Sequence, residues 1–69
     1  MDNDIVVKSN VGDVVVAKKP YDFLGGTRIN IGQEWTVLEK YSYFVKIQKD
    51  DDSFWLGDIN FVDVFEDGE

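Results

Sequence analysis

The chain of 69 residues contains no cysteine and no histidine. Disulfides are therefore excluded, and so are the thiolate and imidazole ligands of the usual zinc sites. No apolar run approaches the roughly 20 residues that a membrane-spanning helix needs. The N-terminal residues Asp2 and Asp4 are acidic, whereas a secretory signal peptide begins with basic residues. We therefore expect no metal, no cofactor, no membrane contact and a cytoplasmic location.

Basic residues are also scarce, with 7 Lys and Arg against 14 Asp and Glu and a net charge of -7. Because a phosphate backbone repels this charge, we expect no direct nucleic-acid binding. The acidic excess serves solubility, or it attracts a protein partner with a basic surface. The chain is rich in hydrophobic residues (43%) and aromatic residues (14%), which is enough for the core of one small domain.

The sequence offers little that points to catalysis. Without His or Cys, general acid–base chemistry depends on carboxylates, Lys or Tyr, and the carboxylates fall mostly in turns and at solvent-facing strand positions. Asp50, Asp51 and Asp52 are consecutive, whereas a calcium loop places its acidic ligands at alternating positions, so a hairpin tip is favoured. Residues 25–28 (GGTR) lack the Lys-Ser/Thr of a phosphate-binding loop. We predict no catalytic residues, no metal site and a protein that is not an enzyme.

Short runs of β-branched and aromatic residues, separated by turn signals, dominate the first two thirds of the chain. The run GQEWTVLEK at residues 32–40 begins on a turn glycine and is typical of a central strand. Residues 13–18 are expected to form the first strand, which Pro20 ends because proline lacks the N–H donor of the ladder. The double glycine at residues 25–26 marks the tip of a long, irregular hairpin.

The second half continues the same pattern. In the strand expected at residues 43–49, alternation places Val45 and Ile47 on one face. The opposite face then carries Phe44 with polar neighbours. A short strand at residues 54–56, a single helical turn at 57–60 and a closing strand at 61–65 complete five strands of an all-β domain.

The order of these elements resembles the Src-homology-3 fold over residues 12–65. AKKPYDF at residues 17–23 is similar to that family's Ala-Leu-Tyr-Asp-Tyr/Phe motif, and GQEWTVLEK is similar to its Gly-Asp-x-Leu-x-Val-Leu-Glu strand. Residues 54–62 resemble its closing segment, with Gly57 in place of the family's proline. Phe44-Val45 stands where the family has a Trp-Trp pair. In size and acidity the chain also looks like small proteins of this fold from bacteria and phages, which would place it in the host cytoplasm.

The resemblance implies a single five-stranded barrel over residues 12–66, with a short helical turn before the last strand. An arm or extra strand is expected at residues 1–11 and a mobile acidic tail at residues 67–69. Trp35 and Trp55 are expected to fill the core. The aromatic residues are too numerous for so small an interior, so some are expected to form a partner site. The predicted site consists of Tyr21, Phe23, Phe44 and Phe61, rimmed by Asp22 and Asp58.

Three functions are compatible with these patterns. The first is a non-catalytic protein-interaction module, a monomer or weak homo-oligomer, that binds a partner through the aromatic site. The second is an acidic phage-type inhibitor that mimics nucleic-acid charge and blocks a host DNA-binding protein. Its carboxylates would be those of Asp50, Asp51, Asp52, Asp58, Asp63, Glu66, Asp67 and Glu69. The third is a structural subunit that adds strands to a neighbour at a sheet edge.

Overall fold

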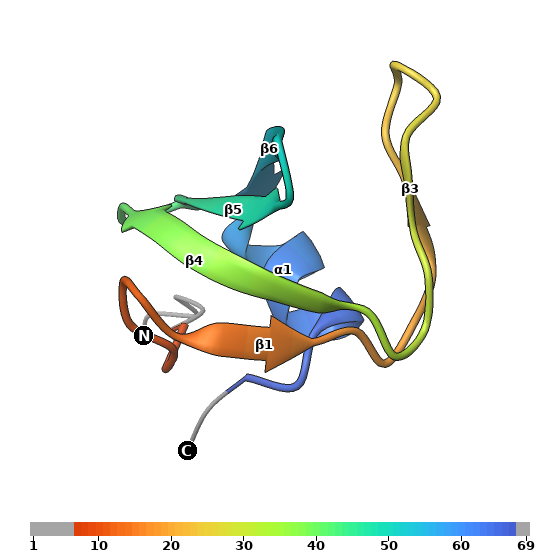
Figure 1. The fold of residues 1–69 in the computed structure, drawn as a ribbon. Helices are drawn as coiled ribbons and strands as arrows, with labels where there is room; N and C mark the ends of the chain where they lie inside the picture. Colours follow the sequence, from red (N-terminus) through yellow and green to blue (C-terminus); the bar gives the residue numbers. More distant parts are fainter. Residues whose placement is uncertain (1–6, 68–69) are drawn as a thin grey trace.

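The computed structural model describes residues 7–67, which form six strands and one helix. In chain order these are β1 (Val14–Val16), β2 (Tyr21–Asp22), β3 (Arg28–Ile29), β4 (Glu34–Lys40), β5 (Phe44–Lys49), β6 (Asp52–Gly57) and α1 (Asp58–Val64). β1, β4, β5 and β6 form one antiparallel sheet in that order. β2 and β3 pair separately in a hairpin that projects from the sheet (Figure 1). The predicted mostly-β character is confirmed.

The sheet is open. β1 and β6 are its two edges, and within residues 7–67 no ladder joins them into a closed barrel. The end of the described chain returns to the first strand through an isolated bridge between Ala17 and Phe65, beside which the amide of Glu66 donates to the carbonyl oxygen of Val16 at 2.9 Å. The amides of Lys18 and Lys19 also donate to the carbonyl oxygen of Val64, so the last turn of α1 covers the edge beyond β1.

The predicted closing strand at residues 61–65 is wrong, because most of it is helical. As a strand, alternation would place Phe61 and Asp63 on the same buried face. In α1, helical spacing brings Phe61, Val64 and the following Phe65 together in the core, and Asp63 points outward to pair with Lys19 at 2.8 Å. The helix lies against β5 and β6. Apolar residues at 61, 64 and 65 have the i, i+3, i+4 spacing of one helix face, and this is the signal that the strand prediction overlooked.

The core lies between the sheet and α1. Its buried members are Val7, Val15, Ala17, Ile29, Trp35, Val37, Val45, Ile47, Leu56, Phe61, Val64 and Phe65. The predicted alternation in β5 is confirmed, since Val45 and Ile47 are buried while Phe44 is exposed. In β1, β4 and β5 the buried residues stand at alternate positions, as expected for a sheet with one covered face: Val15, then Trp35 and Val37, then Val45 and Ile47.

The two tryptophans have opposite environments. Trp35 in β4 is buried, as predicted. Trp55 in β6 is 48% exposed, so its predicted place in the core is wrong. The register explains the difference, because Leu56 pairs with Val45 on the core side and its neighbour Trp55 must then face outward.

The two ends of the described chain are joined by the Asp67 carboxylate. It accepts hydrogen bonds from the backbone amides of Lys8 (2.6 Å) and Ser9 (2.9 Å) and from the Ser9 hydroxyl (2.8 Å). Asp67, predicted to begin a mobile tail, therefore holds the N-terminal arm, with Val7 buried in the core. Residues 7–10 of the arm are not in a strand, and the rest of the predicted arm and tail, residues 1–6 and 68–69, lies outside the described residues.

Candidate protein-interaction surface

The structure divides the predicted partner site among separate environments. Phe61 has 0% exposure in the core, so it is unable to contact a partner. Asp58, the first residue of α1, is also buried, and its carboxylate accepts a 2.7 Å hydrogen bond from the Ile59 amide. A carboxylate in the first helical turn interacts favourably with the helix dipole. Both side chains are therefore buried parts of the fold, and neither lies on the surface where the sequence placed them.

Tyr21 and Phe23 belong to a partly buried aromatic group that joins the β2–β3 hairpin to the sheet. The Phe23 ring stacks on Phe54 with centroids 4.2 Å apart, and Tyr21 meets Phe23 edge-on at 5.1 Å. Phe54 in turn contacts Trp35 at 6.1 Å. These rings pack against the core, so their main contribution is to anchor the hairpin.

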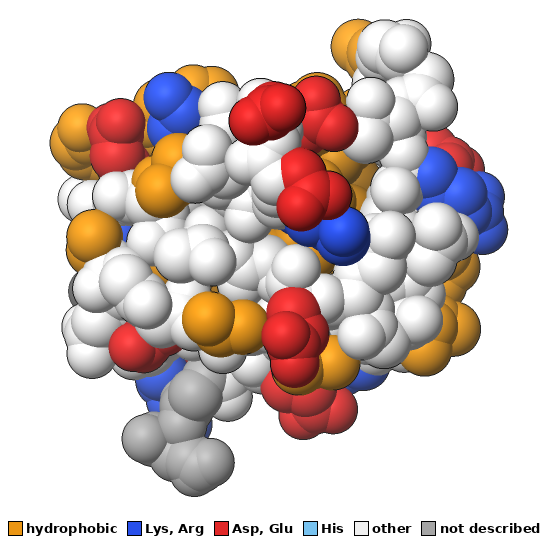
Figure 2. Space-filling model, in the orientation of Figure 1, with side chains coloured by type: hydrophobic (Ala, Val, Ile, Leu, Met, Phe, Trp, Pro, Cys, Tyr) orange, Lys and Arg blue, Asp and Glu red, His pale blue; other side chains and the backbone are white. Residues whose placement is uncertain are grey.

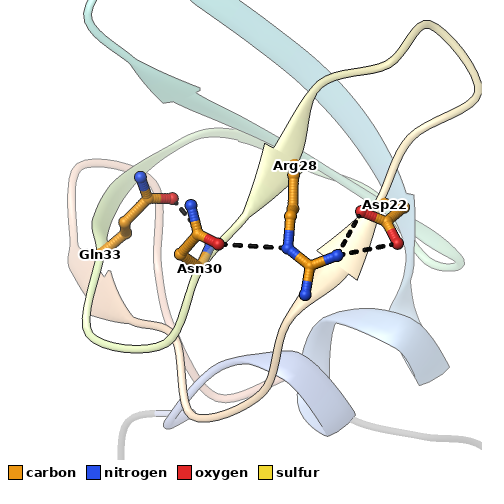
Figure 3. Close-up of polar contacts among 4 residues, drawn as sticks. All are labelled: Asp22, Arg28, Asn30 and Gln33. Atoms are coloured by element: carbon orange, nitrogen blue, oxygen red, sulfur yellow. Dashed lines mark hydrogen bonds and ion pairs between the residues drawn. The ribbon is translucent and has the colours of Figure 1, made fainter.

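The other predicted rim residue, Asp22, is engaged within the same hairpin. Figure 3 shows its carboxylate facing the Arg28 guanidinium across β2 and β3, with Nη1 at 2.9 Å and 3.2 Å from the two oxygens. Arg28 Nε also donates to Asn30 Oδ1 at 3.2 Å, and the backbone N–H of Asn30 donates to Gln33 Oε1 at 2.9 Å. This chain of contacts stabilises the base of the hairpin and leaves Asp22 paired.

Phe44 lies elsewhere, on the outer face of the sheet, and is 55% exposed. The amide of Tyr41 donates to the carbonyl oxygen of Phe44 at 2.8 Å, which places these two residues opposite each other where β4 turns into β5. Phe44 pairs with Gly57, so Trp55 is its diagonal neighbour on the same face. The Tyr41 and Trp55 rings are 5.8 Å apart. Three exposed aromatic side chains thus share this face, of which sequence reasoning placed only Phe44 in the site.

A charged pair completes the group. A β-bulge between Val37 and Glu39 shifts the register of β4 so that Glu39 lies opposite Lys46. Glu39 Oε2 is 3.9 Å from Lys46 Nζ, and Glu39 Oε1 accepts a 2.8 Å hydrogen bond from the Tyr41 hydroxyl. This hydrogen bond, with the negative charge of Glu39, raises the pKa of Tyr41. Lys46 Nζ also lies 5.6 Å from the centre of the Trp55 ring.

We call this set the outer cluster; it consists of Glu39, Tyr41, Phe44, Lys46 and Trp55. All five come from β4, β5, β6 and the turn after β4, so the sheet fixes their relative positions. Alternation in the run Phe54-Trp55-Leu56 is a sequence signal that identifies Trp55 as outward-facing once Leu56 is assigned to the core. No sequence signal indicates the bulge that brings Glu39 to Lys46.

Most of the acidic side chains in residues 7–67 are exposed. On the face drawn in Figure 2 they lie in several separate groups, some of them beside Lys or Arg. Within residues 7–67, no three acidic residues are arranged to hold a metal ion, and Asp50–Asp52 lie exposed at the turn between β5 and β6. In the same part of the chain, no helix has the length and apolar character needed to cross a membrane.

Comparisons with protein-family models, with curated proteins and with solved structures found no match to this chain.

Proposed function

We propose that this protein is a non-catalytic interaction module that binds a protein partner through the outer cluster. The observation that carries the proposal is the exposure of three aromatic side chains on one sheet face: Tyr41 (57%), Phe44 (55%) and Trp55 (48%). Aromatic residues gathered on the surface of a small domain are typical of partner sites, where Trp and Tyr carry much of the binding energy. None of these rings belongs to the buried core between the sheet and α1.

The outer cluster is also rigidly supported. Its residues come from neighbouring positions of three paired strands, and Tyr41 is held by hydrogen bonds from both its amide and its hydroxyl. A surface that is already ordered loses little conformational entropy when a partner binds. A catalytic role has no comparable support, because the groups of the cluster that could act as acid, base or nucleophile engage one another: Glu39 accepts from the Tyr41 hydroxyl and pairs with Lys46.

The proposed fold assignment is an open variant of the Src-homology-3 architecture. Three features support it: a long hairpin between β1 and β4, a meander of β4, β5 and β6, and a helical segment before the Ala17–Phe65 bridge. In this variant, α1 replaces most of the closing strand. Phe44, which stands at the position of the family's first paired tryptophan, keeps an exposed ring on the surface.

Capture from a lysate of the native host tests the proposal. Immobilised wild-type protein is compared with Phe44→Ser and Trp55→Ser, each at low and at high salt. The matched control is Leu24→Ser, which removes a fully exposed apolar side chain at the tip of the β2–β3 hairpin. We expect one protein to be retained by the wild type and by Leu24→Ser, to be lost from both aromatic variants, and to persist at high salt.

Two results would contradict the proposal. If the retained protein still binds both aromatic variants but is lost at high salt, then the acidic surface is the functional one and charge mimicry replaces aromatic recognition. If only Leu24→Ser loses the partner, the hairpin tip is the contact surface. Thermal melting of all three variants checks that each is folded.

A further inference from the structure

The outer cluster already holds a cation, and that cation belongs to the protein itself. The ammonium group of Lys46 lies 5.6 Å from the centre of the Trp55 ring and 3.9 Å from Glu39 Oε2. A cation near an aromatic face is attracted by the ring quadrupole, and a nearby carboxylate adds to this attraction. The combination of a half-exposed ring, a carboxylate and an adjacent tyrosine is a site suited to positive charge.

We infer that the outer cluster recognises an arginine side chain of a basic partner segment, which takes the place of Lys46 over the Trp55 ring and pairs with Glu39. This inference rests on the proposed function and specifies the chemistry of the partner. Tyr41 already donates to Glu39 Oε1 at 2.8 Å, so the incoming guanidinium is expected to pair with Oε2. Phe44, the diagonal neighbour of Trp55, then contacts the apolar stem of the arginine or the residue beside it.

Exchange of Lys46 for an external arginine is energetically reasonable. The Lys46–Glu39 pair is long at 3.9 Å and partly exposed, and exposed ion pairs of this kind contribute little to stability. Lys46 has a flexible stem that is able to turn its ammonium group into water. A guanidinium is planar, stacks on aromatic rings and matches the shape of a carboxylate, so it suits this site better than an ammonium does.

The charge of the whole chain favours the same class of partner. With a net charge of -7, the protein attracts basic segments and repels acidic ones at long range. An acidic ligand would also meet Glu39 at the centre of the outer cluster. The aromatic rings and the long-range charge therefore select the same ligand, a basic peptide with an arginine at its contact point.

The test is an NMR titration of isotope-labelled protein with the capped pentapeptide Gly-Gly-Arg-Gly-Gly, and with the same peptide carrying citrulline, the neutral analogue of arginine. We expect saturable shifts of the Trp55 indole resonance with the arginine peptide only. Removing the internal competitor in Lys46→Gln should tighten binding by about 2- to 30-fold, and removing the carboxylate in Glu39→Gln should weaken it by a similar factor.

Two matched variants control for net charge. Lys18→Gln and Asp51→Asn remove one exposed charge each, away from the outer cluster, and should leave the affinity within about twofold of wild type. The inference is overturned if the citrulline peptide shifts the indole equally or if Lys46→Gln weakens binding. It is also overturned if Asp51→Asn weakens binding as much as Glu39→Gln does.

The two proposals fail in different experiments. If capture of the natural partner depends on Phe44 and Trp55 while the arginine peptide does not bind, only the arginine inference is wrong. If capture is indifferent to both aromatic residues, the proposed function is wrong, whatever the peptide titration shows.

Discussion

Glu39 lies directly opposite Lys46 across β4 and β5, although regular pairing from Val37 and Ile47 onward would place Leu38 there. One extra residue in the bulge produces this arrangement, and it also turns Glu39 toward the hydroxyl of Tyr41. A local irregularity of the backbone thus gives an otherwise aromatic surface its carboxylate. The same carboxylate affects the ionisation of Tyr41, which an experiment can follow directly.

We predict that Glu39→Gln lowers the pKa of Tyr41 toward its ordinary value of 10.0, because the hydrogen bond to a charged acceptor and the negative charge both raise it in the wild type. Because folding raises the pKa of Tyr41, the protonated hydroxyl stabilises the folded state. This contribution to the free energy of unfolding is fully present below pH 10.0 and is lost as the pH rises through the folded-state pKa. NMR of labelled tyrosine follows the ionisation. Glu34→Gln, at an exposed position of the same strand, is the control. An unchanged pKa of Tyr41 in Glu39→Gln would show that the Glu39 carboxylate does not cause the raised pKa.

A second prediction contrasts two phenylalanines that the sequence placed in one site. Phe44→Ala should change the free energy of unfolding by less than about 1 kcal/mol, because the ring is largely exposed. Phe61→Ala should cost about 3–5 kcal/mol, because it leaves a cavity in the core. Denaturant unfolding of both variants measures the difference. Similar losses for the two would mean that Phe44 is buried and that the outer face has been misassigned.

A third prediction concerns the tryptophans. Trp35→Ala should cost roughly 3–5 kcal/mol, whereas the half-exposed Trp55→Ala should cost less than half as much. The buried Trp35 Nε1 has no hydrogen-bond partner within residues 7–67. Both Trp35→Phe and Trp35→Ala remove this donor, so the difference between them comes from the ring that phenylalanine keeps in the core. Trp35→Phe should therefore be at least ~2 kcal/mol more stable than Trp35→Ala. Chemical denaturation checks all three variants, and equal losses for Trp35→Phe and Trp35→Ala would argue against this account of the core.

Sequence reasoning predicted the sheet better than the surface. Alternation identified Val45 and Ile47 as core residues and Phe44 as exposed, because the two-residue period of a strand is visible in the sequence. It failed for Phe61, where a short apolar run fits either a strand or a helix and the packing of the whole domain decides between them.

The outer cluster was harder to predict from the sequence than the sheet, for a physical reason. The positions of Glu39 and Tyr41 depend on a bulge and a turn, and these set a register that alternation alone does not reveal. Trp55 was expected in the core, although its neighbours Phe54 and Leu56 take the inward positions of β6 opposite Ile47 and Val45. Large aromatic residues are common both in cores and in partner sites, so residue type alone did not distinguish them.

A fourth prediction tests the link between the two ends of the chain. Asp67→Ala removes an acceptor of three hydrogen bonds from Lys8 and Ser9 and should cost about 1–3 kcal/mol. Hydrogen exchange at the amides of Lys8 and Ser9 should accelerate, since both lose this acceptor. Glu66→Ala, which changes an exposed neighbouring carboxylate, should leave both properties unchanged. Equal effects of the two substitutions would show that loss of acidic charge, rather than the Asp67 contacts, is responsible.

The most direct measurement of the central claim is an NMR footprint of the captured partner on isotope-labelled protein. We predict that the largest shifts fall on the outer cluster, including the Trp55 indole and the amides of Tyr41 and Phe44. The β2–β3 hairpin and α1 should change little. Shifts centred on residues 21–29, on residues 58–64 or on the acidic turn at Asp50–Asp52, with the Trp55 indole unmoved, would contradict the account.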